Sequence, residues 1–274
     1  MYSTPFVMRV DVYRDARALA QSTGSFYLQR DRAGRELLHL VTVRHVVEEG
    51  ARDGERMIPA QELRVNLALT AAAGGGLREL RIPLYTRTGA PTWLGPDDAH
   101  GAPDVLIVPL PAEAVSDCRL AYLEAASALG HGGALQPLTS IHVVGFPVDH
   151  YDEVHATPVY QTGVLAADGS QDFGGQPCMP VEMATYPGMA GAPAFAVEAD
   201  PRGQGAMRRF LGIYSGLPIA GDGRHAEAFI ETGRAGVAAR DAAIWGRIWK
   251  ARVIEELLGD FDAERWEREV LAEL

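Results

Sequence analysis

The segment YPGMAGAPAF, residues 186–195, decides the fold class of this chain. Its two glycines, Gly188 and Gly191, enclose Met189 and Ala190, and glycine adopts backbone conformations that are often closed to residues with a Cβ. A sharp turn is therefore expected at Gly188, directly before the strand-like residues 194–197. The segments on either side indicate what this turn is built into.

Most of the chain has the pattern of short strands joined by turns. Its 30 glycines and 17 prolines are spread over all 274 residues instead of being pooled in one linker. In the first half, the strand-like residues are 25–28, 37–43, 63–69, 79–84 and 105–110, and Gly74 to Gly76 are expected at a hairpin turn. In the second half they are 141–144, 159–165, 181–184, 194–197 and 210–214. These segments predict an all-β fold made of two strand-rich halves of similar size.

Helical patterns are confined to the middle and the end of the chain. A short helix is expected over residues 119–128, between the two halves. Over residues 242–258 the apolar residues recur at three- and four-residue spacing, which predicts a helix with one buried face. A last helix is expected from Ala263 to the C-terminus, with Asp262 as its N-cap. Its expected buried face consists of Trp266, Val270 and Leu271.

Composition and charge exclude several classes of function. The chain has 25 Lys and Arg against 36 Asp and Glu, a net charge of −11, so no nucleic-acid partner is expected. No run approaches the roughly 20 apolar residues of a membrane span, and the N-terminus lacks the pattern of a secretory signal, so no membrane is expected and the location is predicted to be cytoplasmic. Cys118 and Cys178 are 60 positions apart with no CxxC motif, which fits a reducing compartment. His150, Asp152 and His155 are better explained as a solvated loop than as a metal site, so neither a metal nor a cofactor is expected.

Two further segments carry residues that are typical of a catalytic site. The apolar residues 40–43 run into His45, and Asp104 stands at the head of the apolar residues 105–110. His45 could be a core histidine bonded to backbone, and Asp104 could simply end a turn. An acid in this position is also where the second nitrogen of a histidine finds its partner. The two residues alone leave these alternatives open.

The order His45, Asp104, then Gly188-Met189-Ala190-Gly191 resembles the trypsin-like (chymotrypsin-fold) serine peptidases, in particular their bacterial branch without disulfides. The spacings are 59 residues from His45 to Asp104 and 86 from Asp104 to Ala190. The likeness covers roughly residues 20 to 258, because residues 23–28 resemble the first strand of the first barrel and residues 211–216 resemble a wall of the substrate cleft.

This resemblance implies two antiparallel six-stranded β-barrels with a C-terminal helical segment. The first barrel would span residues 1–130 and carry His45 and Asp104, and the second would span residues 131–240 and carry the loop from Gly188 to Ala190. Residues 241–274 would form the C-terminal helices.

The resemblance also implies a role for each residue of the site. His45 would be the general base, Asp104 would orient it, and the backbone N–H groups of Gly188 and Ala190 would form the oxyanion hole. The substrate is expected to be a protein or peptide. Ala184 and Thr185 would lie at the base of the first specificity pocket, so no acid would select basic side chains there. The backbone of Tyr214, Ser215 and Gly216 would pair with an extended substrate.

The chain departs from the family at the nucleophile, because Ala190 stands where the family has its serine. A methyl group cannot attack a carbonyl, and Ser25, Ser140, Ser170 and Ser215 all lack a glycine-flanked turn. A replaced serine is favoured over a natural pseudoenzyme, because a chain without a catalytic role has no physical reason to keep His45, Asp104 and the glycine-lined loop together. The expected function is therefore an intracellular serine endopeptidase inactivated at position 190, gated by a regulatory partner in a bacterial stress or antiviral defence pathway. The alternative is a natural pseudoprotease that binds peptides or acts as a scaffold.

Overall fold

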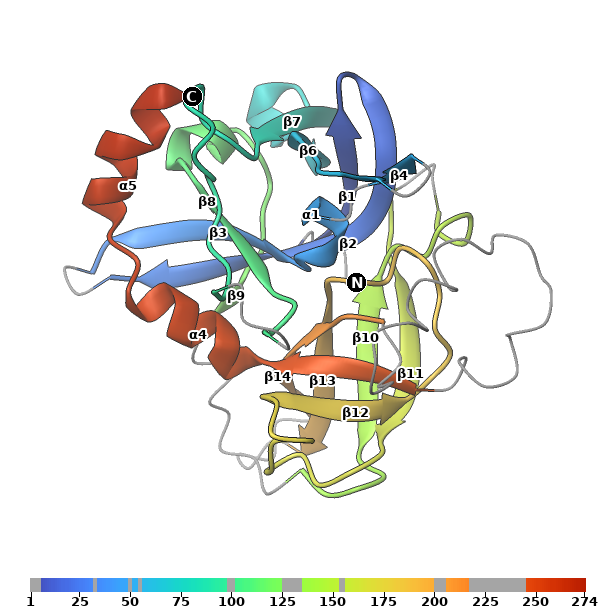
Figure 1. Ribbon diagram of the computed structural model, residues 1–274. Coiled ribbons are helices and arrows are strands. Elements are labelled where there is room, and N and C mark those ends of the chain that lie inside the picture. Colours follow the sequence, from blue (N-terminus) through green and yellow to red (C-terminus); the bar gives the residue numbers. More distant parts are fainter. Residues whose placement is uncertain are drawn as a thin grey trace.

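The computed structural model describes residues 6–31, 34–48, 51–53, 56–97, 102–124, 135–152, 156–199, 206–216 and 245–274. Figure 1 shows two β units with a helical C-terminal segment running along the outside of the first unit. Each of the ten strand segments expected from the sequence overlaps a strand of the structure, although β2 is much longer than expected and β12 begins and ends earlier. Strands β1, β4, β5, β9 and β15 and the first half of β2 are additional.

The first unit is an open sheet with the strand order β7-β6-β1-β2-β3-β8, in which all neighbours are antiparallel, and β9 pairs in parallel with β2. The expected closed first barrel is thus a half-barrel in the part of the chain that is described. The small hairpin β4-β5 is separate from this sheet. The strand bounds are β1 Val7–Arg14, β2 Arg17–Arg30, β3 Glu36–Thr42, β4 Ala51–Asp53, β5 Arg56–Ile58, β6 Glu62–Ala68, β7 Leu77–Pro83, β8 Leu106–Leu110 and β9 Leu123–Glu124.

The second unit is a closed barrel in the order β10-β11-β12-β15-β14-β13. Closure pairs every strand on both sides, so the barrel has no free edge. The strand bounds are β10 Ser140–Gly145, β11 Val159–Leu165, β12 Cys178–Glu182, β13 Ala192–Ala199, β14 Ala206–Tyr214 and β15 Trp245–Lys250.

The helices are short. They are α1 His45–Glu48, α4 Ala251–Gly259 and α5 Ala263–Glu269, with 3-10 turns η1 Ala71–Ala73, η2 Ala112–Val115 and η3 Leu271–Glu273. The start of α5 confirms the expected N-cap, since the side chain of Asp262 accepts a hydrogen bond from the N–H of Arg265. Trp266, Val270 and Leu271 are half-buried.

Two helix predictions are wrong. Residues 245–250 form β15 and not part of a helix, because this segment pairs with β12 on one side and β14 on the other and so closes the second barrel. The expected helix therefore begins only at Ala251, and residues 242–244 lie outside the described residues. Residues 119–124 are not helical either, since Leu123–Glu124 pair with β2; residues 125–128 lie outside the described residues.

One hydrophobic core joins the two units. Its buried side chains come from the strands of the first sheet, from the second barrel through Phe146, Phe195 and Phe210, and from α4 through Ile254 and Leu258. A second cluster fills the interior of the closed barrel. The shared core holds the loops of the second barrel against the first sheet.

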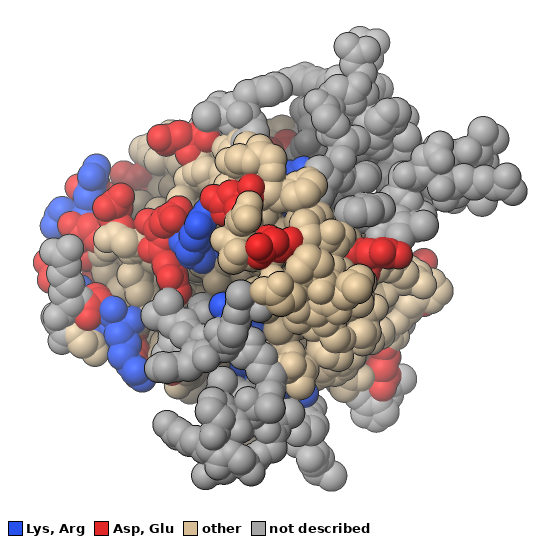
Figure 2. Space-filling view, turned by 90° about the horizontal axis from the view of Figure 1, so that it is seen from below, with Lys and Arg blue, Asp and Glu red and all other residues tan. Residues whose placement is uncertain are grey.

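Charged side chains of both signs gather on the left of Figure 2, the side that carries α4 and α5 in Figure 1, while most of the face in the middle is uncharged. Several are paired, as in the ion pairs Arg265–Glu269 and Arg35–Asp31. The described surface on this side is therefore mixed in charge.

Candidate functional site

His45 and Asp104 meet because of the pairing of two strands. His45 begins α1 directly after β3, Asp104 lies just before β8, and β3 and β8 are antiparallel neighbours with Thr42 opposite Leu106. The ring Nδ1 of His45 lies 2.6 Å from Oδ2 of Asp104, and the backbone N–H of His45 donates to Oδ1 at 2.9 Å. The expected contact is confirmed, and both side chains are largely buried, with 17% and 14% of their surface exposed.

Asp104 is ionised despite its burial. Burial alone would raise the pKa of this carboxyl, but the attraction of His45 and hydrogen bonds from its ring, its backbone N–H and that of Arg44 together hold the pKa below its usual value. An ionised carboxylate only accepts hydrogen bonds, so the proton of the neutral imidazole lies on Nδ1. The lone pair of that tautomer is then on Nε2, as a general base of this kind requires.

Glycine is required at both ends of the turn that follows β12. Gly188 has φ +89°, and a Cβ there would lie 2.5 Å from the carbonyl oxygen of Phe146. Gly191 has φ +86°, and a Cβ there would lie 2.0 Å from the carbonyl oxygen of Thr23. Both conformations are strained for other residues, and neither position has space for a side chain.

The backbone N–H groups of this turn divide into two sets. Those of Met189, Gly191 and Ala192 donate to the carbonyls of Tyr186, Tyr214 and Met189, at 3.2, 2.7 and 3.0 Å. Within the described chain, the N–H groups of Gly188 and Ala190 donate no hydrogen bond. Two such donors in one turn can bind an anionic oxygen. They are the two positions expected to form an oxyanion hole.

The turn lies against the first sheet. The N–H of Thr23 in β2 donates to the carbonyl of Ala190 at 2.9 Å, and Ala190 packs against the core shared by the two units. Thr42, three residues before His45, donates from its hydroxyl to the carbonyl of Thr23 at 2.8 Å. Residue 190 is thus joined by two hydrogen bonds in series to the strand that precedes His45.

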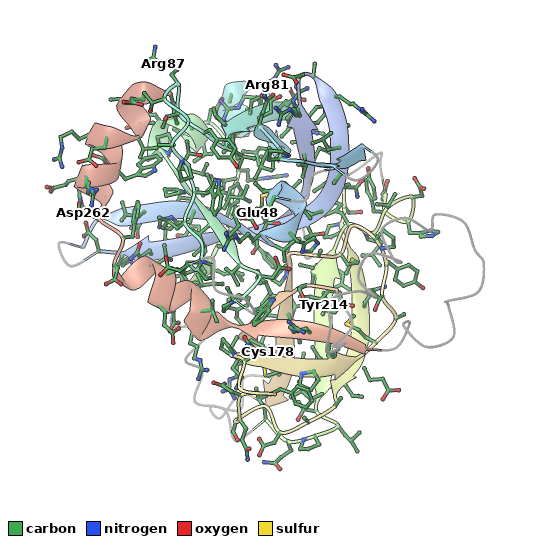
Figure 3. The ribbon with its side chains drawn as sticks, viewed as in Figure 1. Glu48, Arg81, Arg87, Cys178, Tyr214 and Asp262 are labelled. Carbon is green, nitrogen blue, oxygen red and sulfur yellow. The ribbon has the colours of Figure 1, made fainter. Side chains whose placement is uncertain are left out.

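The expected substrate-binding residues lie beside this turn. Ala184 is exposed and Thr185 is half-buried, whereas Tyr214 and Ser215 are buried. The hydroxyl of Tyr214 donates to Oγ1 of Thr185 at 3.1 Å. In Figure 3, the label Tyr214 marks this residue in the second barrel, and the label Glu48 marks the end of α1, the short helix that begins with His45 in the first unit.

Part of the expected cleft wall is already used by the barrel. The carbonyl of Tyr214 accepts from Gly191, and the N–H of Ser215 donates to the carbonyl of Arg247 at 2.9 Å. Among the described residues, the backbone of Gly216 and the carbonyl of Ser215 make no backbone hydrogen bond. An extended peptide could therefore pair with these two residues and not with Tyr214.

The other candidates are simpler. His150 packs edge-on against Tyr186, with ring centroids 6.0 Å apart, and His155 lies outside the described residues. In the described ranges, no group of three or more His, Cys, Asp or Glu could hold a metal ion, and no helix is long and apolar enough to cross a membrane. Cys118 and Cys178 are both buried and free.

Sequence reasoning missed the threonines that connect the two units. Thr23 and Thr42 are fully buried and polar, but their bonding partners lie as much as 165 residues away. No local pattern signals such a contact. The only hint is a polar run, residues 22–25, at the start of an apolar strand.

The described chain thus forms two β units, one a closed six-stranded barrel and the other a half-barrel. No family model matches the chain, and no curated protein matches it. Among solved structures, it is similar to the inactive form of the Ser343Ala mutant of Rv3671c from M. tuberculosis H37Rv, at 14% identity and a TM-score of 0.45, covering 93% of this chain and 85% of that one.

Two further solved structures are similar over most of this chain. One is the serine endoprotease from Yersinia pestis, at 13% identity and a TM-score of 0.47, covering 97% of this chain and 64% of that one. The other is the HtrA-type protease AlgW with decapeptide, at 12% identity and a TM-score of 0.45, covering 97% and 65%. This chain therefore spans less than two thirds of either protein.

Proposed function

We propose that this chain is a trypsin-like serine endopeptidase with alanine at its nucleophile position, which binds peptides without cleaving them. The observation that carries the proposal is the turn at residues 188–192, whose N–H groups are all used except those of Gly188 and Ala190. The supporting observation is the imidazole of His45, which an ionised Asp104 holds in the tautomer that can accept a proton at Nε2.

With a serine at position 190, the site would run acyl transfer. Its hydroxyl oxygen would attack the substrate carbonyl while the proton passes to Nε2 of His45. The carbonyl oxygen would become an oxyanion that accepts from the N–H groups of Gly188 and residue 190. His45 would then protonate the leaving amine, and a water molecule activated by His45 would hydrolyse the acyl-enzyme.

Alanine removes the attacking oxygen and little else. Both alanine and serine supply a backbone N–H, so both donors of the hole are kept. Peptide binding uses the backbone of Ser215 and Gly216 and the side-chain pocket beside them, none of which involves the missing hydroxyl. The chain should therefore retain ground-state affinity for a peptide.

The ring of Tyr214 fills the space beside Thr185, which the resemblance to the serine peptidases places at the base of the first specificity pocket. A Cβ at Gly246 would lie 2.3 Å from Cε2 of Tyr214, and a Cβ at Gly216 would lie 3.4 Å from Cε1. The ring therefore lies between these two glycines, with its hydroxyl on Thr185. The peptide residue before the cleaved bond should accordingly be small, such as glycine, alanine or serine.

A natural pseudoprotease is the second candidate, and Ala190 itself is the observation that favours it. Such a protein would use the same cleft for peptide binding or scaffolding and would not hydrolyse peptides. Gating by a regulatory partner and a role in bacterial stress or defence are expectations from the sequence alone, because no described residue bears on them.

Ala190→Ser separates the two candidates. The variant should react with a fluorophosphonate probe, which labels an activated serine, and the double variant Ala190→Ser with His45→Ala should not. Calorimetric binding of one peptide with alanine before its target bond should be similar for the unaltered chain and the double variant. Labelling of Ala190→Ser at the rate of an unactivated serine, with peptide binding intact, would favour the pseudoprotease.

A further inference from the structure

Every polar atom of Thr23 forms a hydrogen bond with the turn that carries the proposed oxyanion hole or with a residue next to that turn. It lies in β2 of the first unit and is fully buried. Its N–H donates to the carbonyl of Ala190 at 2.9 Å, and its carbonyl accepts from the hydroxyl of Thr42 at 2.8 Å. Its hydroxyl bonds to two further groups of the second barrel, the N–H of Phe146 at 2.9 Å and the carbonyl of Gly188 at 2.7 Å.

The direction of these hydroxyl bonds follows from the partners. The N–H of Phe146 can only donate, so the single proton of the Thr23 hydroxyl goes to the carbonyl of Gly188. This bond fixes the peptide plane that follows Gly188. The plane that precedes it is fixed by the N–H of Val148, which donates to the carbonyl of Pro187 at 2.8 Å.

Gly188 is therefore held from both sides. Rotating the preceding plane would turn the N–H of Gly188 away and break the bond from Val148. Rotating the following plane would break the bond from Thr23 and leave two buried polar groups, the carbonyl of Gly188 and the hydroxyl proton of Thr23, without partners. A glycine at φ +89° has few steric barriers of its own, so these hydrogen bonds determine which conformation it keeps.

The same residue links the turn to the strand of His45. Thr42 lies three residues before His45 and is also fully buried. Its hydroxyl proton goes to the carbonyl of Thr23, so the hydroxyl of Ser22, 3.3 Å from Oγ1 of Thr42, is the donor in that contact. A Cβ at Gly191 would lie 2.0 Å from the carbonyl of Thr23 and 2.5 Å from Oγ1 of Thr42, so the turn passes against both threonines.

We infer that Thr23 is a positioning residue, whose hydroxyl holds the carbonyl of Gly188 and, through it, the turn that presents the N–H groups of Gly188 and residue 190. This inference rests on the proposed function, because the position of these donors matters only if an oxyanion forms there. It differs from a purely structural role in its consequence. Loss of the hydroxyl should affect the rate of acylation and leave peptide binding almost unchanged.

The test compares Thr23→Val, which keeps the shape and removes the hydroxyl, with Thr23→Ser, which keeps the hydroxyl. Thr92→Val is the matched control, because Thr92 is also a buried residue of the first unit, 2% exposed, and its hydroxyl donates to the carbonyl of Pro83 at 2.6 Å. Each change is made in the unaltered chain for nuclear magnetic resonance of the backbone amides, and in the Ala190→Ser background for peptide hydrolysis.

In the unaltered chain, Thr23→Val should shift or broaden the amide signals of Gly188 and Ala190, and Thr23→Ser and Thr92→Val should not. In the Ala190→Ser background, Thr23→Val should lower kcat about 10-fold or more with KM within about two-fold, since loss of one oxyanion donor lowers kcat by roughly 10² to 10³. Thr23→Ser should restore most of the rate.

Two results would overturn the inference. Unchanged amide signals in Thr23→Val would show that the hydroxyl does not hold the turn, whatever the activity of the Ala190→Ser background. Altered amide signals with an unchanged kcat would make Thr23 a structural anchor only. Altered signals with an Ala190→Ser background that does not react with the fluorophosphonate probe would have the same meaning for Thr23. An unreactive background would also end the proposed function, and the probe experiment identifies that case by itself.

Discussion

Both carboxylate oxygens of Asp104 are hydrogen-bonded to His45, Oδ2 to the ring at 2.6 Å and Oδ1 to the backbone N–H at 2.9 Å. The second bond ties the carboxylate to the first residue of α1, so ring and backbone of His45 are held by one group. This arrangement orients the imidazole before any substrate arrives. Its cost is the burial of a charge, which the hydrogen bonds around Asp104 offset.

Asp104→Asn in the Ala190→Ser background should remove most of the activity and little of the binding. The amide can offer a donor where the carboxylate only accepts, so it favours the tautomer with its proton on Nε2, which cannot act as the base. We expect a loss of about 10⁴ in kcat, by analogy with the same change in a serine protease triad. Steady-state kinetics and calorimetric binding of the same peptide measure the two effects. An equal loss of affinity and kcat would mean that Asp104 only supports the fold.

The contact between His45 and Asp104 could be predicted, although nothing local to either residue indicates it. They are 59 residues apart and meet because β3 pairs with β8, which periodicity alone does not reveal. The order of His45, Asp104 and the glycine turn supplied the missing relation through the family resemblance. The strands themselves were readable because their apolar runs are short and separated by glycine and proline.

The strand β15 shows where such patterns fail. Trp245, Ile248 and Trp249 fit a helical spacing, but β15 carries apolar side chains on both faces. Ile248 lies in the cluster inside the barrel and Trp249 lies in the core shared by the two units. Over six residues such a strand looks like a helix in the sequence. The choice is made by β12 and β14, whose edges need a partner. The hydroxyls of Thr23 and Thr42 were missed for a similar reason, since their importance comes from partners in distant segments.

Acid should destabilise the fold through His39 in β3. Burial lowers its pKa to about 4, and its Nε2 lies 3.1 Å from Oε1 of Gln29, whose amide donates to the carbonyl of Leu258 in α4. The unfolded chain takes up a proton at His39 near pH 6.5 and the folded chain only near pH 4. The free energy of unfolding should therefore fall as pH drops from 6.5 to 4, by up to about 3 kcal/mol.

Urea unfolding at several pH values measures this effect, with His39→Gln as the control. The variant cannot take up the proton, so its free energy of unfolding should fall less steeply than that of the unaltered chain between pH 6.5 and 4. Parallel pH profiles would show that His39 is not kept neutral by the fold.

Gly191→Ala should be among the most destabilising changes at a glycine of this chain. The added Cβ would meet the carbonyl of Thr23 at 2.0 Å, and a backbone group of a paired strand cannot move aside easily. Strain at positive φ and overpacking together predict a loss of about 3 kcal/mol in the free energy of unfolding. Gly174→Ala is the matched control, since Gly174 has φ +62° and nothing within 4 Å, and should lose only about 1 kcal/mol. Chemical denaturation gives both values, and similar losses would contradict the close approach.

Tyr214→Val should widen the range of peptides accepted by the Ala190→Ser variant. In the Ala190→Ser parent, kcat/KM should be at least about 10-fold higher for a peptide with alanine before the cleaved bond than for one with phenylalanine. One or two groups that do not fit a pocket lower kcat/KM by about this factor. Valine leaves a cavity where the ring was, between Gly216 and Gly246. The phenylalanine peptide can then fill that cavity, and the preference should fall or reverse.

Tyr214→Phe is the control for this change, because it removes the hydroxyl bond to Thr185 and keeps the ring. If the ring sets the preference, Tyr214→Phe keeps the selectivity of the parent. If the preference depends on the hydroxyl, Tyr214→Phe loses it as Tyr214→Val does.

Burying an aromatic ring contributes several kcal/mol to stability, so Tyr214→Val should also lower the free energy of unfolding by about 3 kcal/mol. A phenylalanine peptide should recover part of that loss by binding in the cavity, whereas an alanine peptide should not. Thermal unfolding of Tyr214→Val in the Ala190 chain, with and without each peptide, separates a pocket that accepts the larger side chain from one that has collapsed.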